Sequence, residues 1–168
     1  MSDTSAGVTA TVDNPDRALI SALMGKGAFD ENGIAIETNA MFRSVGLRIT
    51  GGKPGSVETR FSVGKECLQG NGVVSGGAIA TMLDCAFATT TLSAIRPGQT
   101  CSTISLTLNA LAAARVGSFR AETVLDRLGR RIAYLSARLF DDRERLIATA
   151  SSAMLVMDMA ETQRVTNG

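Results

Sequence analysis

The longest apolar segment of the chain, residues 73–95, sets the strongest limit on what it can fold into. Apolar side chains recur there at spacings of three and four, which predicts a helix buried on most of its circumference. Asp84 is the only charged residue of the segment and lies at its centre. A carboxylate at that depth would cost about 2.5–3.5 kcal/mol in a bilayer. We therefore interpret the segment as the central helix of a soluble protein rather than as a membrane span.

Much of the rest of the chain alternates polar and apolar side chains with a period of two, as strands do. The runs are residues 57–63, 103–110, 118–128, 131–140 and 146–157, with a weaker one at 42–50 before a turn at 51–55. In the second run the alternating polar residues are Thr103, Ser105, Thr107 and Asn109. Strands surrounding one buried helix predict an α+β fold in which an antiparallel sheet wraps around that helix.

A length of 168 residues corresponds to about one domain. We expect a tail and a short helix (16–24) within residues 1–40, the folded domain over 41–158 and a second tail over 159–168. The first sixteen residues lack the basic flank and apolar core of a signal peptide. The three cysteines have neither disulfide nor zinc-site spacing. A cytoplasmic protein with reduced thiols is the expectation.

Composition excludes several classes of function. The chain has no histidine, which removes Ser-His-Asp and Cys-His catalysis and histidine-ligated metals. Its net charge is +1, and it has one tyrosine and no tryptophan. It therefore offers little positive charge or aromatic surface to nucleic acid or to a membrane. We expect no metal and no cofactor, and a small-molecule partner.

Asp84 admits two interpretations. A lone carboxylate in an uncharged helix is costly unless it is partnered, so it could bond backbone amides or lie at a wet dimer seam. Alternatively, it stands in a cleft because the chemistry there requires a base or a nucleophile.

Gly76 and Gly77 open the same helix, with Ser75 placed as its N-cap. Unpaired N–H groups at a helix N-terminus can polarise a carbonyl and stabilise an oxyanion. The alternative for a Gly-Gly pair is tight packing. Gly76 and Asp84 are separated by roughly 12 Å along one helix, at ~1.5 Å per residue. One small carbonyl reaches both only if Asp84 comes from a second, antiparallel helix, which predicts a two-fold dimer with two interfacial sites.

The run from Gly72 to Ala86, with its Gly76-Gly77 pair and Leu83 and Asp84 after it, resembles the hotdog-fold acyl-CoA thioesterases of the PaaI type. That family typically has G-x-x-H-G-G, about six residues, and then Leu-x-Asp or Leu-x-Glu. The alternating run that begins at Thr103 is similar to the family's polar strand, and the resemblance covers about residues 57–157. It implies a sheet wrapped around a long helix, homodimers or dimers of dimers, and hydrolysis of acyl- or aroyl-CoA.

By this resemblance Asp84 is the nucleophile or the base that activates water, and the Gly76 and Gly77 N–H groups polarise the thioester carbonyl from the other subunit. Thr103 matches a hydroxyl residue that assists the carboxylate, and Gln69 or Asn71 matches a polar amide before the helix. Candidates for the acyl pocket are Met41, Phe42, Met82 and Phe87. Candidate cations for the CoA phosphates are Arg115, Arg120, Arg127, Arg130 and Arg131. Two positions depart from the pattern: Ser75 replaces the family's His, and Ala112-Ala113 replaces its Arg-Pro.

Other functions compete with this one. Hotdog hydratases pair His with an acid, and a Ser75 hydrolase would need both His and a G-x-S-x-G turn, so the sequence disfavours both. Nothing near Cys85 in the sequence would lower the pKa of its thiol, so we interpret it as core. The remaining alternative is a hotdog protein that binds acyl-CoA without turnover.

Overall fold

A computed structural model describes residues 12–27, 29–160 and 162 of the chain. The helical elements are α1 (Pro15–Lys26), α2 (Ala40–Ser44), the 3-10 turn η1 (Lys65–Cys67) and α3 (Gly76–Ala94). The strands are β1 (Ile34–Ala35), β2 (Arg48–Lys53), β3 (Ser56–Val63), β4 (Gln99–Ala110), β5 (Gly117–Leu128), β6 (Ile132–Asp141) and β7 (Leu146–Asp158).

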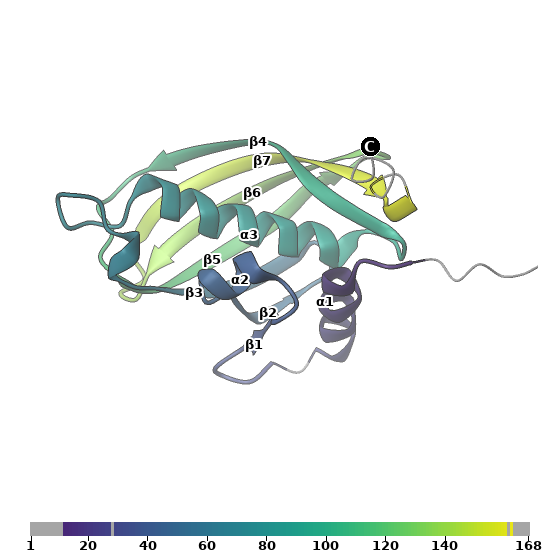
Figure 1. Ribbon diagram of the computed structural model, residues 1–168, viewed down its shortest axis with the longest axis horizontal. Helices are drawn as coiled ribbons and strands as arrows, with labels where there is room; N and C mark the ends of the chain where they lie inside the picture. Colours follow the sequence, from purple (N-terminus) through teal and green to yellow (C-terminus); the bar gives the residue numbers. More distant parts are fainter. Residues whose placement is uncertain (1–11, 28, 161, 163–168) are drawn as a thin grey trace, which may run out of the picture.

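The strands form one antiparallel sheet in the order β1-β2-β3-β5-β6-β7-β4. Figure 1 shows the sheet curving around α3, with the helix along its concave face. The predicted α+β architecture is therefore confirmed. β4 forms one edge of the sheet, and its neighbour is β7.

The core lies between α3 and the concave face of the sheet. Met82, Leu83 and Phe87 of the helix are fully buried there, against sheet residues such as Phe61 and Leu139. Burying an aliphatic or aromatic side chain of this size stabilises the fold by about 1.5–3 kcal/mol. The apolar spacing that predicted a mostly buried helix thus corresponds to this packing.

Local capping explains where the two longer helices begin and end. The Asn14 side chain accepts a 3.1 Å hydrogen bond from the Arg17 N–H, and Pro15 occupies the first helical position. Gly27 ends α1 in a left-handed conformation, with φ of 60°. At α3 the Ser75 hydroxyl accepts a 3.2 Å bond from the Ala78 N–H, so Ser75 is the N-cap as predicted.

The weakly alternating run 42–50 is only partly a strand. The Asn39 side chain accepts hydrogen bonds from two N–H groups of the next turn and starts the short helix α2, which takes Phe42 out of the strand. β2 then continues through Gly51 and Gly52, and its register with β3 shifts between Ile49 and Gly51. The tight turn itself is confined to Pro54 and Gly55, the latter with φ of 79°.

The described residues among the first forty contact the rest of the domain through both α1 and β1. α1 packs on α3, and residue Asp13 before it bonds both the Arg17 guanidinium and the Gly98 N–H (2.9 Å) of the loop that leads into β4. β1 pairs with β2, so this segment also contributes a strand to the sheet. Among the described residues, no helix combines the length and apolarity needed to cross a membrane.

Candidate functional site

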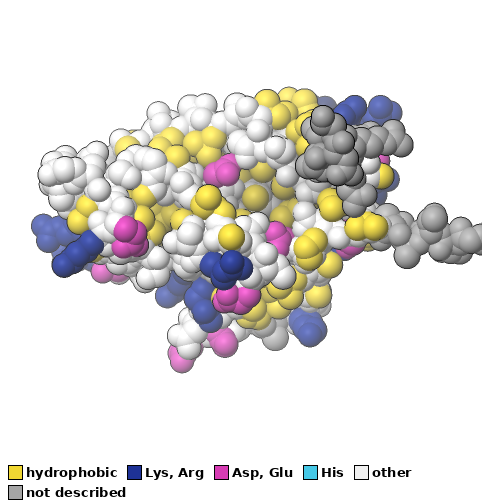
Figure 2. Space-filling model, in the orientation of Figure 1, with side chains coloured by type: hydrophobic (Ala, Val, Ile, Leu, Met, Phe, Trp, Pro, Cys, Tyr) yellow, Lys and Arg dark blue, Asp and Glu magenta, His cyan; other side chains and the backbone are white. Residues whose placement is uncertain are grey.

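Asp84 lies on the one strip of α3 that the sheet leaves uncovered. Gly77, Thr81, Asp84 and Ala88 recur at helical spacing along this strip and are exposed or half-buried, whereas most of the other α3 residues are buried. The face of the molecule over α3 is largely apolar and uncharged, with an acidic group near its centre (Figure 2). The lone carboxylate is thus presented outward from an apolar helix.

The Asp84 carboxylate is partnered within the chain. The Thr103 hydroxyl donates a 2.6 Å hydrogen bond to Asp84 Oδ1, which joins β4 to the middle of α3. A short hydroxyl-to-carboxylate bond of this kind fixes the orientation of the acceptor. The structure therefore brings together two residues that the family resemblance had connected.

A β-bulge in β4 aims Thr103 at the helix. Thr103 pairs with Met154, which is buried on the concave face, whereas Ser105 pairs with Ala153, and the register shifts between them. Directly paired residues point to the same face of a sheet. Thr103 therefore faces inward, while Ser105, Thr107 and Asn109 face outward, although simple alternation would put all four on one face. The extra residue at the bulge, Ile104, is 54% exposed.

The N-terminus of α3 is open. A Cβ atom built at Gly76 has no neighbour within 4 Å, and Gly76 and Gly77 are both exposed. Gly76 is therefore not required for tight packing within the chain. The Ser75 side chain satisfies the Ala78 N–H, and the Ser75 carbonyl accepts from the Ile79 N–H (3.1 Å). The N–H groups of Gly76 and Gly77 come before those of Ala78 and Ile79 and point out of the N-terminal end of the helix. A ligand there can accept hydrogen bonds from them.

The loop before α3 is built from local hydrogen bonds. The Gln69 N–H donates a 2.9 Å hydrogen bond to the Val73 carbonyl, and the Gln69 carbonyl accepts one of 2.9 Å from the Gly72 N–H. The Asn71 side chain accepts a hydrogen bond from the Val73 N–H (3.3 Å). Gln69 and Asn71 are exposed near the helix N-terminus. Asn71 has a role in holding this loop, and the Gln69 side chain is exposed to solvent.

The predicted acyl-pocket residues do not form one surface. Met82 and Phe87 are fully buried, and Phe42 is 3% exposed, so these three belong to the core of the chain. Met41, in contrast, is 54% exposed on α2. Within the chain, Met82 and Phe87 pack between α3 and the sheet, and the acyl pocket itself stays a prediction.

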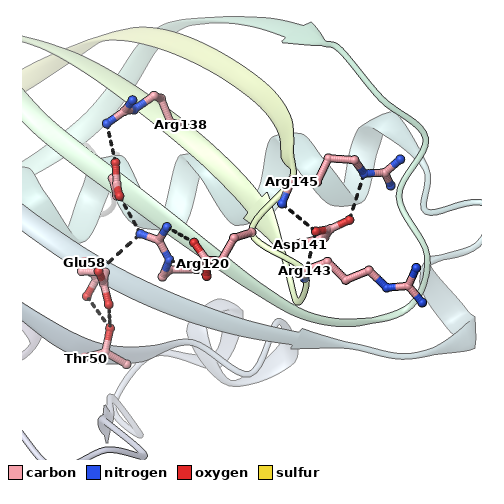
Figure 3. Close-up of polar contacts among 9 residues, drawn as sticks. Thr50, Glu58, Arg120, Arg138, Asp141, Arg143 and Arg145 are labelled. Atoms are coloured by element: carbon pink, nitrogen blue, oxygen red, sulfur yellow. Dashed lines mark hydrogen bonds and ion pairs between the residues drawn. The ribbon is translucent and has the colours of Figure 1, made fainter.

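The candidate cations lie in different places. Arg120 on the convex face bonds Glu58 (3.4 Å), Glu122 (2.6 Å) and Glu144, and its guanidinium stacks 4.6 Å from the centroid of the Phe140 ring. Figure 3 shows this network, with Arg138 joined to it on the far side of Glu122. Hydrogen bonding to Arg120 lowers the pKa of Glu122. Arg120 is thus committed to structural ion pairs.

Three of the other candidate arginines line cavities at the two ends of the molecule, and Arg127 lies near the end of β5. Arg115 lines a cavity of about 370 Å³ together with Arg143 and Arg145 of the β6–β7 turn, at the end where α3 begins. Arg130 and Arg131 line a cavity of about 200 Å³ with Arg96, at the end where α3 finishes. Sequence reasoning missed Arg143 and Arg145, because only the tertiary fold brings their turn beside Arg115.

The cysteine thiols are unsuited to nucleophilic chemistry. Burial, followed by the nearby Asp84 charge, raises the pKa of both Cys85 and Cys101 to about 12. Both thiols therefore remain protonated at neutral pH. Cys85 is 3% exposed and packs in the core.

Part of the chain is similar to a known family. Residues 71–148 match the family described as the Thioesterase superfamily. A Pseudomonas aeruginosa protein provisionally described as an esterase is 38% identical over 88 residues, which cover 52% of this chain and 64% of the relative. The chain thus spans less than two thirds of the length of this curated relative.

Solved structures agree on the fold. A Ralstonia eutropha JMP134 protein, provisionally described as a thioesterase related to phenylacetic acid degradation, is 27% identical with a TM-score of 0.68, over 81% of this chain and 98% of its own. A Streptococcus mutans protein, solved with acetyl-CoA bound, is 19% identical with a TM-score of 0.61, over 67% of this chain and 89% of its own. The predicted resemblance is confirmed in that residues 71–148 match the Thioesterase superfamily and the fold is the hotdog fold shared with the E. coli PaaI protein, which is 16% identical with a TM-score of 0.67 over 84% of this chain and 94% of its own.

Proposed function

We propose that this protein hydrolyses an acyl-CoA or aroyl-CoA thioester to the free acid and coenzyme A. The observation that carries the proposal is the state of Asp84: the only charged side chain of α3, on its uncovered strip, held by the Thr103 hydroxyl at 2.6 Å. A carboxylate oriented in this way can attack a carbonyl carbon or take a proton from water.

The family match and the named relatives support the choice of substrate. The matched domain is that of thioesterases, and the Streptococcus mutans neighbour was solved with acetyl-CoA. The description of the Ralstonia eutropha neighbour relates it to phenylacetic acid degradation, which supports an aromatic acyl group as the alternative to an aliphatic one.

A second copy of the chain completes the site in this proposal. Gly76 and Asp84 stand eight residues apart on α3, roughly 12 Å at ~1.5 Å per residue, too far for one carbonyl to touch both. The twelve residues of β4, at the sheet edge, include no charged residue and no proline. Long uncharged edges invite pairing with another strand. Pairing of two β4 strands about a two-fold axis would set the two α3 helices antiparallel, with Gly76 of one copy near Asp84 of the other.

The chemistry then divides between the two copies. The Gly76 N–H polarises the thioester carbonyl and stabilises the oxyanion that forms on it. In one path Asp84 takes a proton from water as the water oxygen attacks the carbonyl carbon. In the other, an Asp84 oxygen attacks directly and forms an anhydride that water then hydrolyses. In both, the C–S bond breaks and the CoA sulfur leaves as a thiolate that takes up a proton.

The test is thiol release from phenylacetyl-, benzoyl-, short-chain and medium-chain acyl-CoA, comparing the native protein with Asp84→Asn. We expect clear turnover of one class and a loss on the order of 10³-fold in the variant, the usual size of an acid–base contribution. The matched control is Asp126→Asn on β5, an exposed carboxylate that also accepts from a hydroxyl, that of Ser136 at 3.0 Å. This control should leave turnover unchanged.

Two outcomes would contradict the proposal: full activity in Asp84→Asn, or no turnover of any thioester by a folded native protein. Tight CoA binding in the second case would instead support a binding protein without turnover. A single turnover in H₂¹⁸O tests for the anhydride path. Label in the Asp84 carboxylate indicates an anhydride that water opens at the Asp84 carbonyl, whereas label only in the product acid results both from direct attack by water and from an anhydride opened at the acyl carbon.

A further inference from the structure

We propose that one buried water molecule binds between α3 and the sheet, where it joins the hydroxyl groups of Thr59, Thr90 and Thr123, the threonine cluster. In the part of the chain that the structure describes, these three hydroxyls are the buried side-chain polar groups that have no hydrogen-bond partner. Each of the three residues is at most 1% exposed. A buried hydroxyl without a partner destabilises the folded state, so a ligand that bonds all three is favoured.

Two members of the threonine cluster are diagonal neighbours on adjacent strands. Thr59 of β3 pairs with Ala121 of β5, and Thr123 of β5 pairs with Val57 of β3. All four side chains are buried, which places them on the concave face that α3 covers. Diagonal neighbours in an antiparallel pair lie about 7–8 Å apart. The two hydroxyls are thus too far apart to bond each other, and one water with two hydrogen bonds of about 2.8 Å suits the gap.

Thr90 of α3 differs from the threonines on either side of it. The Thr89 hydroxyl donates a 2.8 Å hydrogen bond to the Cys85 carbonyl, and the Thr91 hydroxyl donates one of 2.8 Å to the Phe87 carbonyl. Such a bond to the preceding turn is the usual way in which a threonine inside a helix satisfies its hydroxyl. Thr90 makes no bond of this kind although it is fully buried, so its hydroxyl is available to a ligand.

Contacts near the end of α3 place Thr90 beside the two strand threonines. The Ser93 hydroxyl accepts a 2.9 Å hydrogen bond from the Gly55 N–H, and the Gly55 carbonyl accepts one of 2.8 Å from the Leu125 N–H. Thr90 precedes Ser93 by about 4.5 Å along the helix, and Thr123 precedes Leu125 by about 7 Å along β5. Because α3 lies along the concave face and contacts both β3 and β5, Thr90 and Thr123 are at nearly the same level.

Water is the ligand whose chemistry matches the threonine cluster. A buried water typically makes about three hydrogen bonds, to polar groups that have no other partner. Each threonine hydroxyl can donate or accept, so one water can satisfy all three. The bridge connects α3 to β3 and β5 through directional bonds in a layer that is otherwise held by apolar packing. It therefore fixes the position of the helix along the sheet.

The experiment combines a high-resolution crystal structure of the native protein with variants of the same side-chain shape. The crystal structure should show one ordered water within hydrogen-bond distance of all three hydroxyls. Thr59→Val, Thr90→Val and Thr123→Val each remove one partner of this water and should each lower the melting temperature by about 2–4 °C. The triple variant has no hydroxyl left to satisfy, so its loss should be smaller than the sum of the three. Thr89→Val is the matched control and should change the melting temperature little.

The sign of the change in melting temperature decides the question. If the three hydroxyls have no ligand, replacing any of them with a methyl group removes an unsatisfied buried polar group and stabilises the protein. An unchanged or higher melting temperature in the single variants would therefore overturn the inference. A native crystal structure in which the hydroxyls bond backbone carbonyls, with no water between them, would also overturn it. Neither measurement involves a thioester, so the result is independent of the proposed function.

Discussion

The Thr103 hydroxyl on β4 donates a 2.6 Å hydrogen bond to the Asp84 carboxylate on α3. It reaches the helix because the bulge turns Thr103 to the concave face of the sheet. The bond links the edge strand to the one charged side chain of the helix, so the orientation of the carboxylate depends on β4.

Thr103→Val should lower kcat about tenfold and leave KM nearly unchanged, because the carboxylate keeps its place on α3 but loses the donor that orients it. Thr103→Ser restores the hydroxyl and should recover most of the activity. The measurement is steady-state thiol release for both variants at equal folded concentration. Full activity in Thr103→Val together with a loss in Thr103→Ser would show that the methyl group, and not the hydroxyl, matters.

Gly76→Ala should separate folding from activity. A Cβ at Gly76 meets nothing within 4 Å, so the melting temperature should be unchanged or higher. In the proposed dimer the new methyl group would crowd the N–H that is proposed to polarise the carbonyl, and turnover should fall on the order of 100-fold. Gly70→Ala, where a Cβ is equally free, is the matched control and should keep full activity. Normal turnover by the Gly76 variant would remove its N–H from the mechanism.

The free edge of β4 is expected to be an interface between two copies. Ile104 is 54% exposed on this strand, and Ile104→Lys should shift the protein from dimer to monomer, because charges on edge strands oppose pairing. Light scattering coupled to size-exclusion chromatography measures the change, and thiol release should fall in parallel. Ile104→Thr keeps an uncharged β-branched residue and should remain dimeric. A native protein that is monomeric yet active would contradict the shared site.

The N-terminal segment should contribute stability that depends on pH. Hydrogen bonding to Arg17 lowers the pKa of Asp13 from 3.8 to about 2 against the opposing effect of burial. Because the folded-state pKa is the lower one, this contribution is complete above about pH 4 and is lost as the pH falls toward 2.

Asp13→Asn should therefore destabilise the protein on the order of 1 kcal/mol at pH 7, or about 2–4 °C in Tm for a chain of this size. The difference from the native protein should shrink as the pH is lowered from 4 to 2.5. Thermal unfolding at several pH values measures it, with Glu31→Gln as a control for loss of an exposed carboxylate. A difference independent of pH would mean that the charge of Asp13 is not the cause.

Features that depend on local pattern could be predicted from the sequence. These features are the spacing of apolar residues along α3, its Ser75 N-cap and the polar–apolar alternation of β3 and β5–β7. They depend on steric and capping preferences within a few residues. The pairing of Asp84 with Thr103 followed from the family resemblance. The helix α2 was missed because one side chain, Asn39, outweighed a weak alternation.

Features that depend on tertiary contacts could not be predicted. Met82 and Phe87 are fully buried within the chain, and no local pattern distinguishes such residues from those that line a pocket. Arg120 forms ion pairs with three carboxylates, two of which are distant from it in sequence. Arg115 likewise lies beside Arg143 and Arg145, which are distant from it in sequence. No local signal separates an arginine in an ion pair from one that faces a cavity.

The bulge at Ile104 makes the number of residues in β4 part of the site. Removing Ile104 while the strand on both sides keeps its pairing with β7 would leave Thr103 opposite Met154 and Ser105 opposite Ala153, so Thr103 would still face Asp84. Removing Ser105 as well would pair Thr103 with Ala153 and turn it to the convex face. A one-residue deletion at the bulge should therefore preserve turnover, and a two-residue deletion should be as damaging as loss of the hydroxyl itself. In this strand, length carries information that the identities of the residues do not.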